Sequence, residues 1–375
     1  MKIVVVAFVA RTGGALKILE GALEYAENGG STDEWIFILS DQPVKGNREN
    51  VKIQRVARRY GGAFARLHAE LCTVPRIIRG QDPDVVLSLQ NTDHLGRGDR
   101  PLVIYMHQPL PFQTERSFSF LRREERGLAV RQHILGAVIR ASVLRAQVTL
   151  VQTQWLVDYF RSAMPSVTTR KVGSPTNLSP SIGASHSDPV RGFLYPASAA
   201  LYKDHKTLHE GIRILRSSGV SCPRVALTLE RVQLEHAIGE LTEEEASWYE
   251  FLGSISFSEL EAHYATRILV FPSYIETLGL PLYEAQAFGH PIVAASTPFA
   301  REALEGYERV AFFMARDPKS LAGCLAAILR SDSSGHEGPE VMRDAPGHSS
   351  REGSHWEKVH DTLKSVTRRT NATSS

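Results

Sequence analysis

The sequence contains few cysteines and no long apolar run. Its three cysteines, Cys72, Cys222 and Cys324, are odd in number and far apart in the 375 residues, which favours neither a disulfide framework nor a CxxC metal site. No window approaches the roughly 18 to 20 apolar residues that span a bilayer. The first run, MKIVVVAFVA, passes into RTGG without the pattern of a cleavage site. We therefore expect a soluble chain in a reducing cytoplasm.

The formal net charge is only +2, but it is unevenly distributed. In residues 1–170, 23 basic residues against 16 acidic ones give +7, and the remaining residues carry −5. The basic excess is concentrated in residues 52–79 and 116–145. These stretches are compatible with solvated helix faces and equally with a site for an anionic membrane surface or a lipid phosphate. Nucleic acid is disfavoured as a partner, because aromatic residues are not interleaved with the charges.

Short apolar runs alternate with helical periodicity through most of the chain, which is typical of parallel strands joined by crossover helices. At about 150 residues per domain, the length predicts two such domains. The predicted strands are 3–9, 34–40, 51–56, 84–89, 102–107 and 148–153, then 192–197, 224–229, 249–254, 267–273, 291–296 and 309–313. The predicted helices are 14–27, 60–79, 128–145 and 154–163, then 204–217, 256–264, 281–288 and 317–330.

The pattern predicts a fold of class α/β, with two doubly wound domains in tandem. The first covers residues 1–175 and the second residues 190–332. A Ser-, Pro- and Gly-rich linker at 173–189 lies between them, and a flexible surface segment is expected at 331–354. A last amphipathic helix at about 355–366 is expected to pack back on the first domain, and the tail TRRTNATSS to be disordered.

The segment RILVFPSYIETLGLPLYEAQAFGHPIVAAS has the pattern of a strand, a loop, a helix and a second strand. Pro281 suits the first helical position and Gly289 the position just after the helix. The loop Thr277-Leu278-Gly279 would then direct free backbone amides at a ligand above the strand ends. Helix N-termini in that position bind phosphate without a basic side chain.

Two carboxylates flank this predicted anion site, Glu276 in the loop and Glu284 in the first turn of the helix. A carboxylate accepts hydrogen bonds from neutral hydroxyls. Hydroxyls on both sides of a diphosphate indicate a nucleotide sugar. Either glutamate alone could be a solvated residue or a complement to the helix dipole, but the pair around Gly279 and Pro281 favours a binding site.

The stretch PSYIETLGLPLYEAQAFGHPIV resembles the Glu-x7-Glu signature of retaining glycosyltransferases of the GT-B fold, family 4 type. The resemblance implies two Rossmann-like doubly wound domains that face a central cleft. It assigns Glu276 to the transferred sugar, the amides of Thr277, Leu278 and Gly279 to the diphosphate, and Glu284 to the ribose hydroxyls.

The resemblance extends from about residue 1 to residue 330 and implies that a lysine also belongs to the donor site. Lys203, just before a predicted helix, is similar to the family's donor-phosphate lysine, which would offset diphosphate charge and help the leaving group depart. Ser198 stands where most relatives have an arginine, so neutralisation would depend more on Lys203 and the loop amides. His205 is a weaker candidate.

In the first domain, Gly13 and Gly14 lie between the first strand and the first helix and are similar to the family's glycine loop, which faces sugar and acceptor. A tight turn explains them nearly as well, and without GxGxxG, nicotinamide binding is weakly supported. His107 ends a buried strand and matches the histidine that relatives place beside the transferred sugar. Gln152 and Thr153, at another strand end, are weaker candidates for contact with acceptor or donor.

The implied function is transfer of a sugar, with retention, from a nucleoside diphosphate sugar to a hydroxyl acceptor. We expect a glycan or lipid-linked acceptor in polysaccharide, lipopolysaccharide or glycolipid synthesis, and a cytoplasmic enzyme peripheral to the inner membrane face. We expect no cofactor. We also expect the reaction to be independent of metal, because no DxD-type loop ends a strand. A nucleotide-sugar epimerase or hydrolase of GT-B fold and an inert sugar-nucleotide-binding subunit are the alternatives.

Overall fold

The computed structural model describes residues 1–8, 10, 13–28, 32–44, 48–56, 68–174, 191–333 and 354–373. The chain divides into two compact units. Unit 1 consists of Met1–Asn177 together with His348–Ser375, and unit 2 of Leu178–Gly347. Each unit contains its own parallel sheet.

Unit 1 is built on a seven-stranded sheet in the order β3-β2-β1-β4-β5-β6-β7, in which every neighbouring pair is parallel. The strands are β1 (Lys2–Val6), β2 (Glu34–Leu39), β3 (Val51–Arg55), β4 (Val85–Ser88), β5 (Leu102–Met106), β6 (Val148–Val151) and β7 (Thr169–Lys171). The helices are α1 (Gly13–Asn28), η1 (Ala69–Thr73), α3 (Val74–Gln81), α4 (Arg126–Ala129), η2 (Val130–Leu135), α5 (Gly136–Arg145), α6 (Gln154–Ala163) and α14 (His355–Thr373).

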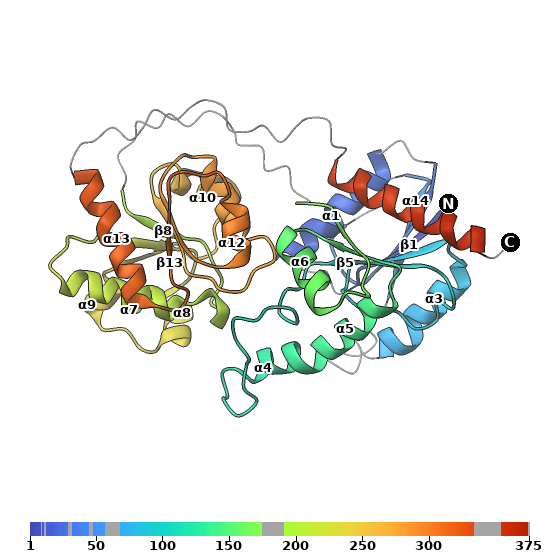
Figure 1. The fold of residues 1–375 in the computed structure, drawn as a ribbon, viewed down its shortest axis with the longest axis horizontal. Coiled ribbons are helices and arrows are strands. Elements are labelled where there is room, and N and C mark those ends of the chain that lie inside the picture. The colour runs from blue at the N-terminus through green and yellow to red at the C-terminus, as the bar shows by residue number, and fades with distance from the viewer. Residues whose placement is uncertain are drawn as a thin grey trace. The chain divides into compact units, whose positions relative to one another are not determined.

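Helices cover both faces of the unit 1 sheet (Figure 1). Side chains alternate between the two faces of a strand, and β1 is apolar on both. Ile3 and Val5 pack with residues of α1 and α14, whereas Val4 and Val6 pack with residues of α3, α5 and α6. The almost continuous apolar run of β1 is therefore explained by burial on two sides.

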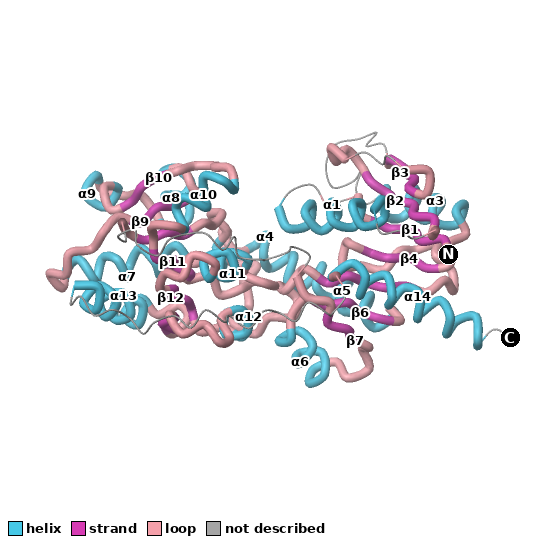
Figure 2. The backbone as a smooth tube through the Cα atoms, turned by 90° about the horizontal axis from the view of Figure 1, so that it is seen from above, coloured by secondary structure: helices cyan, strands magenta, loops and turns pink. Residues whose placement is uncertain are grey.

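Unit 2 is built on a six-stranded parallel sheet in the order β10-β9-β8-β11-β12-β13 (Figure 2). Its strands are β8 (Phe193–Tyr195), β9 (Val225–Leu227), β10 (Tyr249–Phe251), β11 (Ile268–Phe271), β12 (Ile292–Ala295) and β13 (Val310–Phe313). Its helices are η3 (Leu201–Lys203), α7 (His205–Ser217), α8 (Arg231–Ile238), α9 (Glu243–Ala246), α10 (Phe257–Tyr264), α11 (Leu280–Gln286), α12 (Pro298–Ala303) and α13 (Pro318–Ser333).

The strand order reverses direction once in each sheet. In unit 1 this point lies between β1 and β4, and in unit 2 between β8 and β11. Chains leave two such neighbouring strands toward opposite sides, which opens a crevice at their carboxyl ends where ligands of open α/β sheets bind. A ligand site in unit 2 is therefore expected at the loops that follow β8 and β11.

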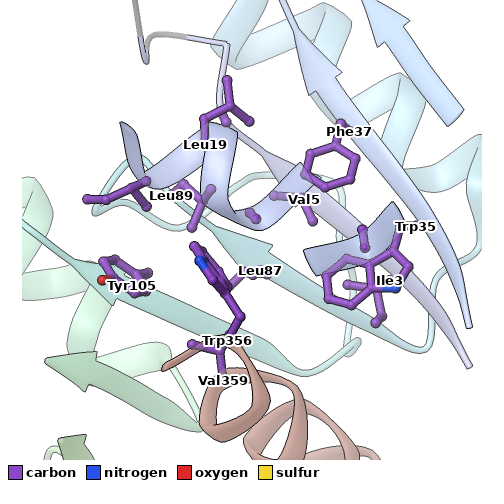
Figure 3. Close-up of a cluster of buried hydrophobic side chains, with 14 of the residues drawn as sticks. Ile3, Val5, Leu19, Trp35, Phe37, Leu87, Leu89, Tyr105, Trp356 and Val359 are labelled. Carbon is purple, nitrogen blue, oxygen red and sulfur yellow. The ribbon is translucent and has the colours of Figure 1, made fainter. Parts of the chain in front are cut away.

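Helix α14, from the end of the chain, completes the core of unit 1 (Figure 3). Trp356 stacks on Tyr105 with ring centroids 5.9 Å apart, and His360 lies 2.7 Å from an Asp33 carboxylate oxygen. Gly21 of α1 provides the space, because a Cβ there would lie 2.6 Å from Trp356 Nε1. Without α14, an apolar part of this core would be exposed.

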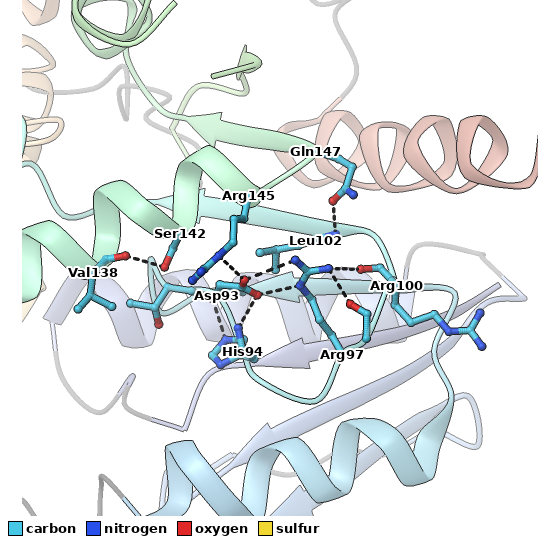
Figure 4. Close-up of polar contacts among 12 residues, drawn as sticks. Asp93, His94, Arg97, Arg100, Leu102, Val138, Ser142, Arg145 and Gln147 are labelled. Carbon is cyan, nitrogen blue, oxygen red and sulfur yellow. Dashed lines mark hydrogen bonds and ion pairs between the residues drawn. The ribbon is translucent and has the colours of Figure 1, made fainter. Parts of the chain in front are cut away.

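The connection between β4 and β5 is fixed by polar contacts around Asp93 (Figure 4). Its carboxylate accepts from Arg97 Nε at 2.8 Å and pairs with Arg145 Nε at 3.0 Å. It also accepts from the backbone amide of His94 at 2.7 Å. The Arg145 contact ties the end of α5 to this loop.

Several sequence-based predictions of elements differ from the structure. The polar edge strand β7 and the short helices α8, α9 and α12 were not predicted, since none has a long apolar pattern. The tail at 367–375 was predicted to be disordered, but α14 continues to Thr373. Helix α13 continues to Ser333, whereas 175–189 of the predicted linker and 334–353 of the predicted surface segment lie outside the described residues.

Candidate active site

Two loops meet at the carboxyl ends of β8 and β11 in unit 2, where the strand order reverses. The backbone carbonyl of Tyr202, in the first loop, accepts from the backbone amide of Tyr274 at 3.1 Å. Ser273 Oγ lies 3.3 Å from the same carbonyl oxygen. The two loops are thus joined by a direct hydrogen bond, which fixes the side chains that they carry.

Lys203 and Glu276 form an ion pair across this junction, from Lys203 Nζ to Glu276 Oε1. Ser273 Oγ donates to the same carboxylate oxygen at 2.8 Å, and Ser273 is fully buried. The side chains of Lys203 and Glu276 are 16% and 17% exposed. They are therefore largely shielded from water and still within reach of a ligand above the strand ends.

Tyr195, the last residue of β8, contacts the loop that carries Lys203. Its hydroxyl donates to the Lys203 carbonyl at 2.6 Å. Burial, and then the negative charge of Glu276, raise the pKa of Tyr195 well above its usual value. The phenol therefore stays protonated and remains a donor.

The second glutamate is held by a tyrosine. Glu284 accepts from the Tyr264 hydroxyl at 2.8 Å, and the Tyr264 ring stacks on Phe288 with centroids 5.7 Å apart. Burial and the nearby Glu284 charge raise the pKa of Tyr264. Glu284 lies in the second turn of α11 and not in the first as predicted, because the helix begins at Leu280.

Gly279 determines how the loop enters α11. It is the N-cap residue in the left-handed conformation, with φ of +68°, which favours glycine. A Cβ at this position would also lie 3.1 Å from Leu282 and 3.3 Å from Phe299. The side chain of Leu278 is buried and that of Thr277 is half-buried.

Ser198 is exposed in the loop after β8, and its carbonyl accepts from His205 Nε2 at 2.9 Å. His205 is almost fully buried, and burial lowers its pKa to about 4. It is therefore neutral at pH 7 and holds the loop.

His107 lies in unit 1, directly after β5. Asn91, after β4, accepts from the His107 backbone amide at 2.9 Å, and its Nδ2 lies 3.3 Å from His107 Nε2. Because an amide nitrogen only donates, Nε2 acts as the acceptor in this contact. Burial lowers the pKa of His107 to about 4, so the ring is neutral at pH 7.

The other candidates in unit 1 lie at helix starts and in the core. Gly13 and Gly14 are the first two residues of α1, and a Cβ at Gly14 would meet no atom within 4 Å. Gln152 is buried and donates to the Tyr105 hydroxyl at 3.0 Å. Thr153 is buried at the N-cap of α6.

Sequence reasoning missed the residues that hold these candidates: Ser273, Tyr264, Asn91 and Tyr195. Ser273 stands three residues before Glu276, a spacing that could have indicated a contact. Tyr264 and Asn91 reach their partners only through the fold. Among the described residues, no three His, Cys, Asp or Glu side chains gather in a way that could hold a metal ion.

The family model matches a part of unit 2 that contains both glutamates. Residues 240–343 match the family described as Glycosyl transferases group 1. The chain is 29% identical over 142 residues to D-inositol 3-phosphate glycosyltransferase of Geodermatophilus obscurus, which is 36% of this chain and 29% of that protein. The same enzyme of Mycobacterium marinum is 29% identical over 160 residues, 42% of this chain and 33% of that protein. The alignments thus span about a third of these relatives.

Solved structures match most of the chain. Sucrose-phosphate synthase of Thermosynechococcus elongatus aligns with a TM-score of 0.66 at 15% identity, over 89% of this chain and 90% of that one. HepE of Anabaena, in complex with UDP and glucose, aligns with a TM-score of 0.58 at 14% identity, over 89% and 91%. The chain has the GT-B fold. Within this GT-B fold, the matched family segment includes Glu276 and Glu284 but not Lys203 or His107.

Proposed function

We propose that this protein is a retaining glycosyltransferase of family 4 type that moves a sugar from a nucleoside diphosphate sugar to a hydroxyl acceptor. The observation that carries the proposal is the Lys203–Glu276 pair, fixed by Ser273 where the strand order of unit 2 reverses. The family match over residues 240–343 supports it. A basic group beside a carboxylate suits a ligand that carries both phosphate and hydroxyl groups.

Each group of the donor has a partner in unit 2 under this proposal. Glu276 accepts hydrogen bonds from the transferred sugar, and Glu284 from the ribose. The amides of Thr277, Leu278 and Gly279 bind the diphosphate. Lys203 exchanges its contact with Glu276 for a phosphate oxygen, which frees the carboxylate for sugar hydroxyls. Because Ser198 supplies no positive charge, Lys203 carries most of the neutralisation.

Retention is proposed to follow a same-face reaction. The bond between the anomeric carbon and the phosphate oxygen breaks, the acceptor oxygen bonds to that carbon, and the acceptor proton passes to the leaving diphosphate. In this reaction Glu276 forms no covalent bond to the sugar. Its role is therefore to position the sugar and stabilise positive charge. His107, neutral at pH 7, adds a contact to the sugar without titrating.

We propose a glycan or lipid-linked acceptor, used in polysaccharide, lipopolysaccharide or glycolipid synthesis at the inner face of the membrane. The basic excess of residues 1–170 supports an anionic acceptor. The names of the two relatives add inositol phosphate to the acceptors worth testing. HepE, solved with UDP and glucose, makes uridine diphosphate sugars the first donors to test.

The experiment is release of nucleoside diphosphate from a donor panel, with and without acceptors, in buffer with and without a metal chelator. Transfer predicts release that depends on acceptor and persists with chelator, and a product whose anomeric configuration matches the donor by NMR. Release without acceptor would indicate a hydrolase or epimerase. Binding of donors without release under any condition would indicate an inert subunit and contradict the proposal.

A further inference from the structure

One continuous part of unit 1 presents apolar side chains outward. We call it the ridge: the loop 117–124 and the uninterrupted helical stretch 126–145 formed by α4, η2 and α5 (Figure 1). Six of the eleven large hydrophobic side chains that are exposed in the described part of the chain belong to it. They are Phe120 (46% exposed), Leu121 (89%), Val130 (45%), Ile134 (60%), Val138 (50%) and Leu144 (54%).

The ridge helix is apolar on both sides. Its inner face buries Ala129, Ile139 and Val143 against the sheet. Val130, Ile134 and Val138 follow each other at intervals of four residues, so they lie along one outer face. A surface helix ordinarily turns charged and polar residues to water. An outer stripe of branched aliphatic residues indicates that another apolar phase covers it.

The helix that carries this stripe has charges of one sign, and Glu124 in the loop before it is the exposed acidic residue of the ridge. From Arg126 to Arg145 the sequence contains four arginines and no Asp or Glu. Arg140 donates to the Pro111 carbonyl at 2.8 Å, and Arg145 pairs with Asp93 (Figure 4). These two contacts fix the helix on the unit, so its outer face exists before any partner binds.

Other arginines of the ridge face solvent. Arg123, in the loop 117–124, and Arg131, in the helix, are exposed. Within the described residues, neither side chain makes a hydrogen bond or an ion pair. Arginines at the border of an apolar face suit a partner surface that has an outer layer of anions and an apolar interior.

We propose that the ridge docks unit 1 onto a bilayer that contains anionic phospholipid. Leu121, Ile134 and Val138 enter the boundary between headgroups and acyl chains, while Arg123 and Arg131 pair with lipid phosphates. The helix lies in the plane of the interface and does not cross it. Among the described residues, no helix is long and apolar enough to span a membrane.

The link between docking and a lipid-linked acceptor rests on the proposed function. The docking itself can be measured without sugar nucleotide or acceptor. A failure of docking would leave transfer to a soluble acceptor intact, and a protein without transferase activity could still bind vesicles. The two outcomes are therefore distinguishable.

The test is flotation of the full chain with vesicles of phosphatidylcholine alone or mixed with phosphatidylglycerol, at low and high salt. We expect binding to the mixed vesicles that weakens with salt. Val138→Glu should lower the partition coefficient about tenfold or more, because a charge replaces an inserted side chain. Arg131→Gln should lower it about fivefold, the expected effect of one basic residue near an anionic surface.

The matched control is Val232→Glu. Val232 is 55% exposed on α8 of unit 2, against 50% for Val138 on α5, so it carries the same change outside the ridge. It should bind vesicles as the parent does, and thermal unfolding should show that both variants fold. Equal binding of Val138→Glu and the parent, or no binding of the parent to either vesicle, would overturn the proposal. So would a dimer in solution that Val138→Glu dissociates while vesicle binding stays absent.

Discussion

Glu276 and Glu284 have the same side chain but different neighbours. Glu276 is held by the cation Lys203 and by the hydroxyl of Ser273. A ligand that carries phosphate and hydroxyl groups can take the place of these contacts. Glu284 accepts a hydrogen bond from the neutral phenol of Tyr264. Removal of Glu276 and removal of Glu284 are therefore expected to change donor binding and turnover to different extents.

Glu284→Ala should raise the dissociation constant of the donor about tenfold, since hydrogen bonds to charged groups contribute about 1.5–3 kcal/mol. Glu276→Ala should instead lower kcat on the order of a hundredfold with a smaller change in donor affinity. Calorimetric titration of the donor and steady-state kinetics measure the two quantities. Glu308→Ala, an exposed glutamate of unit 2, is the control. Near-normal kinetics in both variants would contradict the site assignment.

Asn91 determines which nitrogen of His107 carries the proton. Its amide faces Nε2, and burial lowers the pKa of His107 to about 4. Asn91→Asp places a negative charge there, which raises the pKa of the histidine. We expect the pH profile of kcat/KM to gain an acidic limb that the parent lacks near neutrality, because activity falls as the ring becomes charged.

The control for this prediction is Asn91→Ala, which removes the amide and adds no charge. It should lower kcat/KM at every pH without a new limb. Identical profiles for the parent and Asn91→Asp would show that His107 plays no part in the reaction. NMR titration of the histidine in Asn91→Asp separates this outcome from an unchanged pKa.

At the scale of an element, α14 is the clearest case of a segment whose role depends on a distant part of the chain. Its buried residues Trp356, Val359, Leu363 and Val366 join the core made by β1, β2, β4 and α1. The Tyr105 hydroxyl also lies 3.1 Å from His355 Nε2. The helix thus belongs to unit 1 in both its apolar and its polar contacts.

Trp356→Ala should lower the free energy of unfolding of unit 1 by about 3–5 kcal/mol, the usual cost of removing a buried large aromatic side chain. Chemical denaturation followed by far-UV circular dichroism measures it. Arg368→Ala, at an exposed position of the same helix, should change stability little. A loss below 1 kcal/mol in Trp356→Ala would indicate that α14 does not stabilise the unit.

At the scale of the whole molecule, several histidines are kept neutral by burial. The pKa values of His94, His107, His205 and His355 are each lowered to about 4. In the unfolded chain a histidine titrates near 6.5. Below that pH the unfolded state binds protons that the folded state does not, so stability falls as the pH falls.

We expect the free energy of unfolding to decrease between pH 7 and pH 5, on the order of 1 kcal/mol for each of these histidines. Calorimetric unfolding across this range measures the slope. His355→Gln should reduce the slope for unit 1. His236→Gln, exposed on α8, should leave it unchanged. A stability that is flat between pH 7 and pH 5 would contradict the prediction.

The sequence by itself determined the kinds of element and the fold class. Buried strands such as β1, β5 and β11 are short apolar runs, and a run that is apolar on both faces predicts a covered parallel sheet. The glutamates and the Gly279 turn were visible too, because loop, helix start and carboxylates are local in sequence. Elements without such a pattern, such as the polar strand β7 and the short helix α9, were missed.

Only the tertiary structure decided which distant residues meet. The same alternation of strands and helices is compatible with many strand orders, so the junction of β8 with β11, and with it the Lys203–Glu276 pair, could not be derived from either segment alone. The contacts of Tyr264 with Glu284, Asn91 with His107 and Trp356 with Tyr105 are of this kind. Local sequence encodes which residues must be buried, whereas packing of the whole chain chooses their partners.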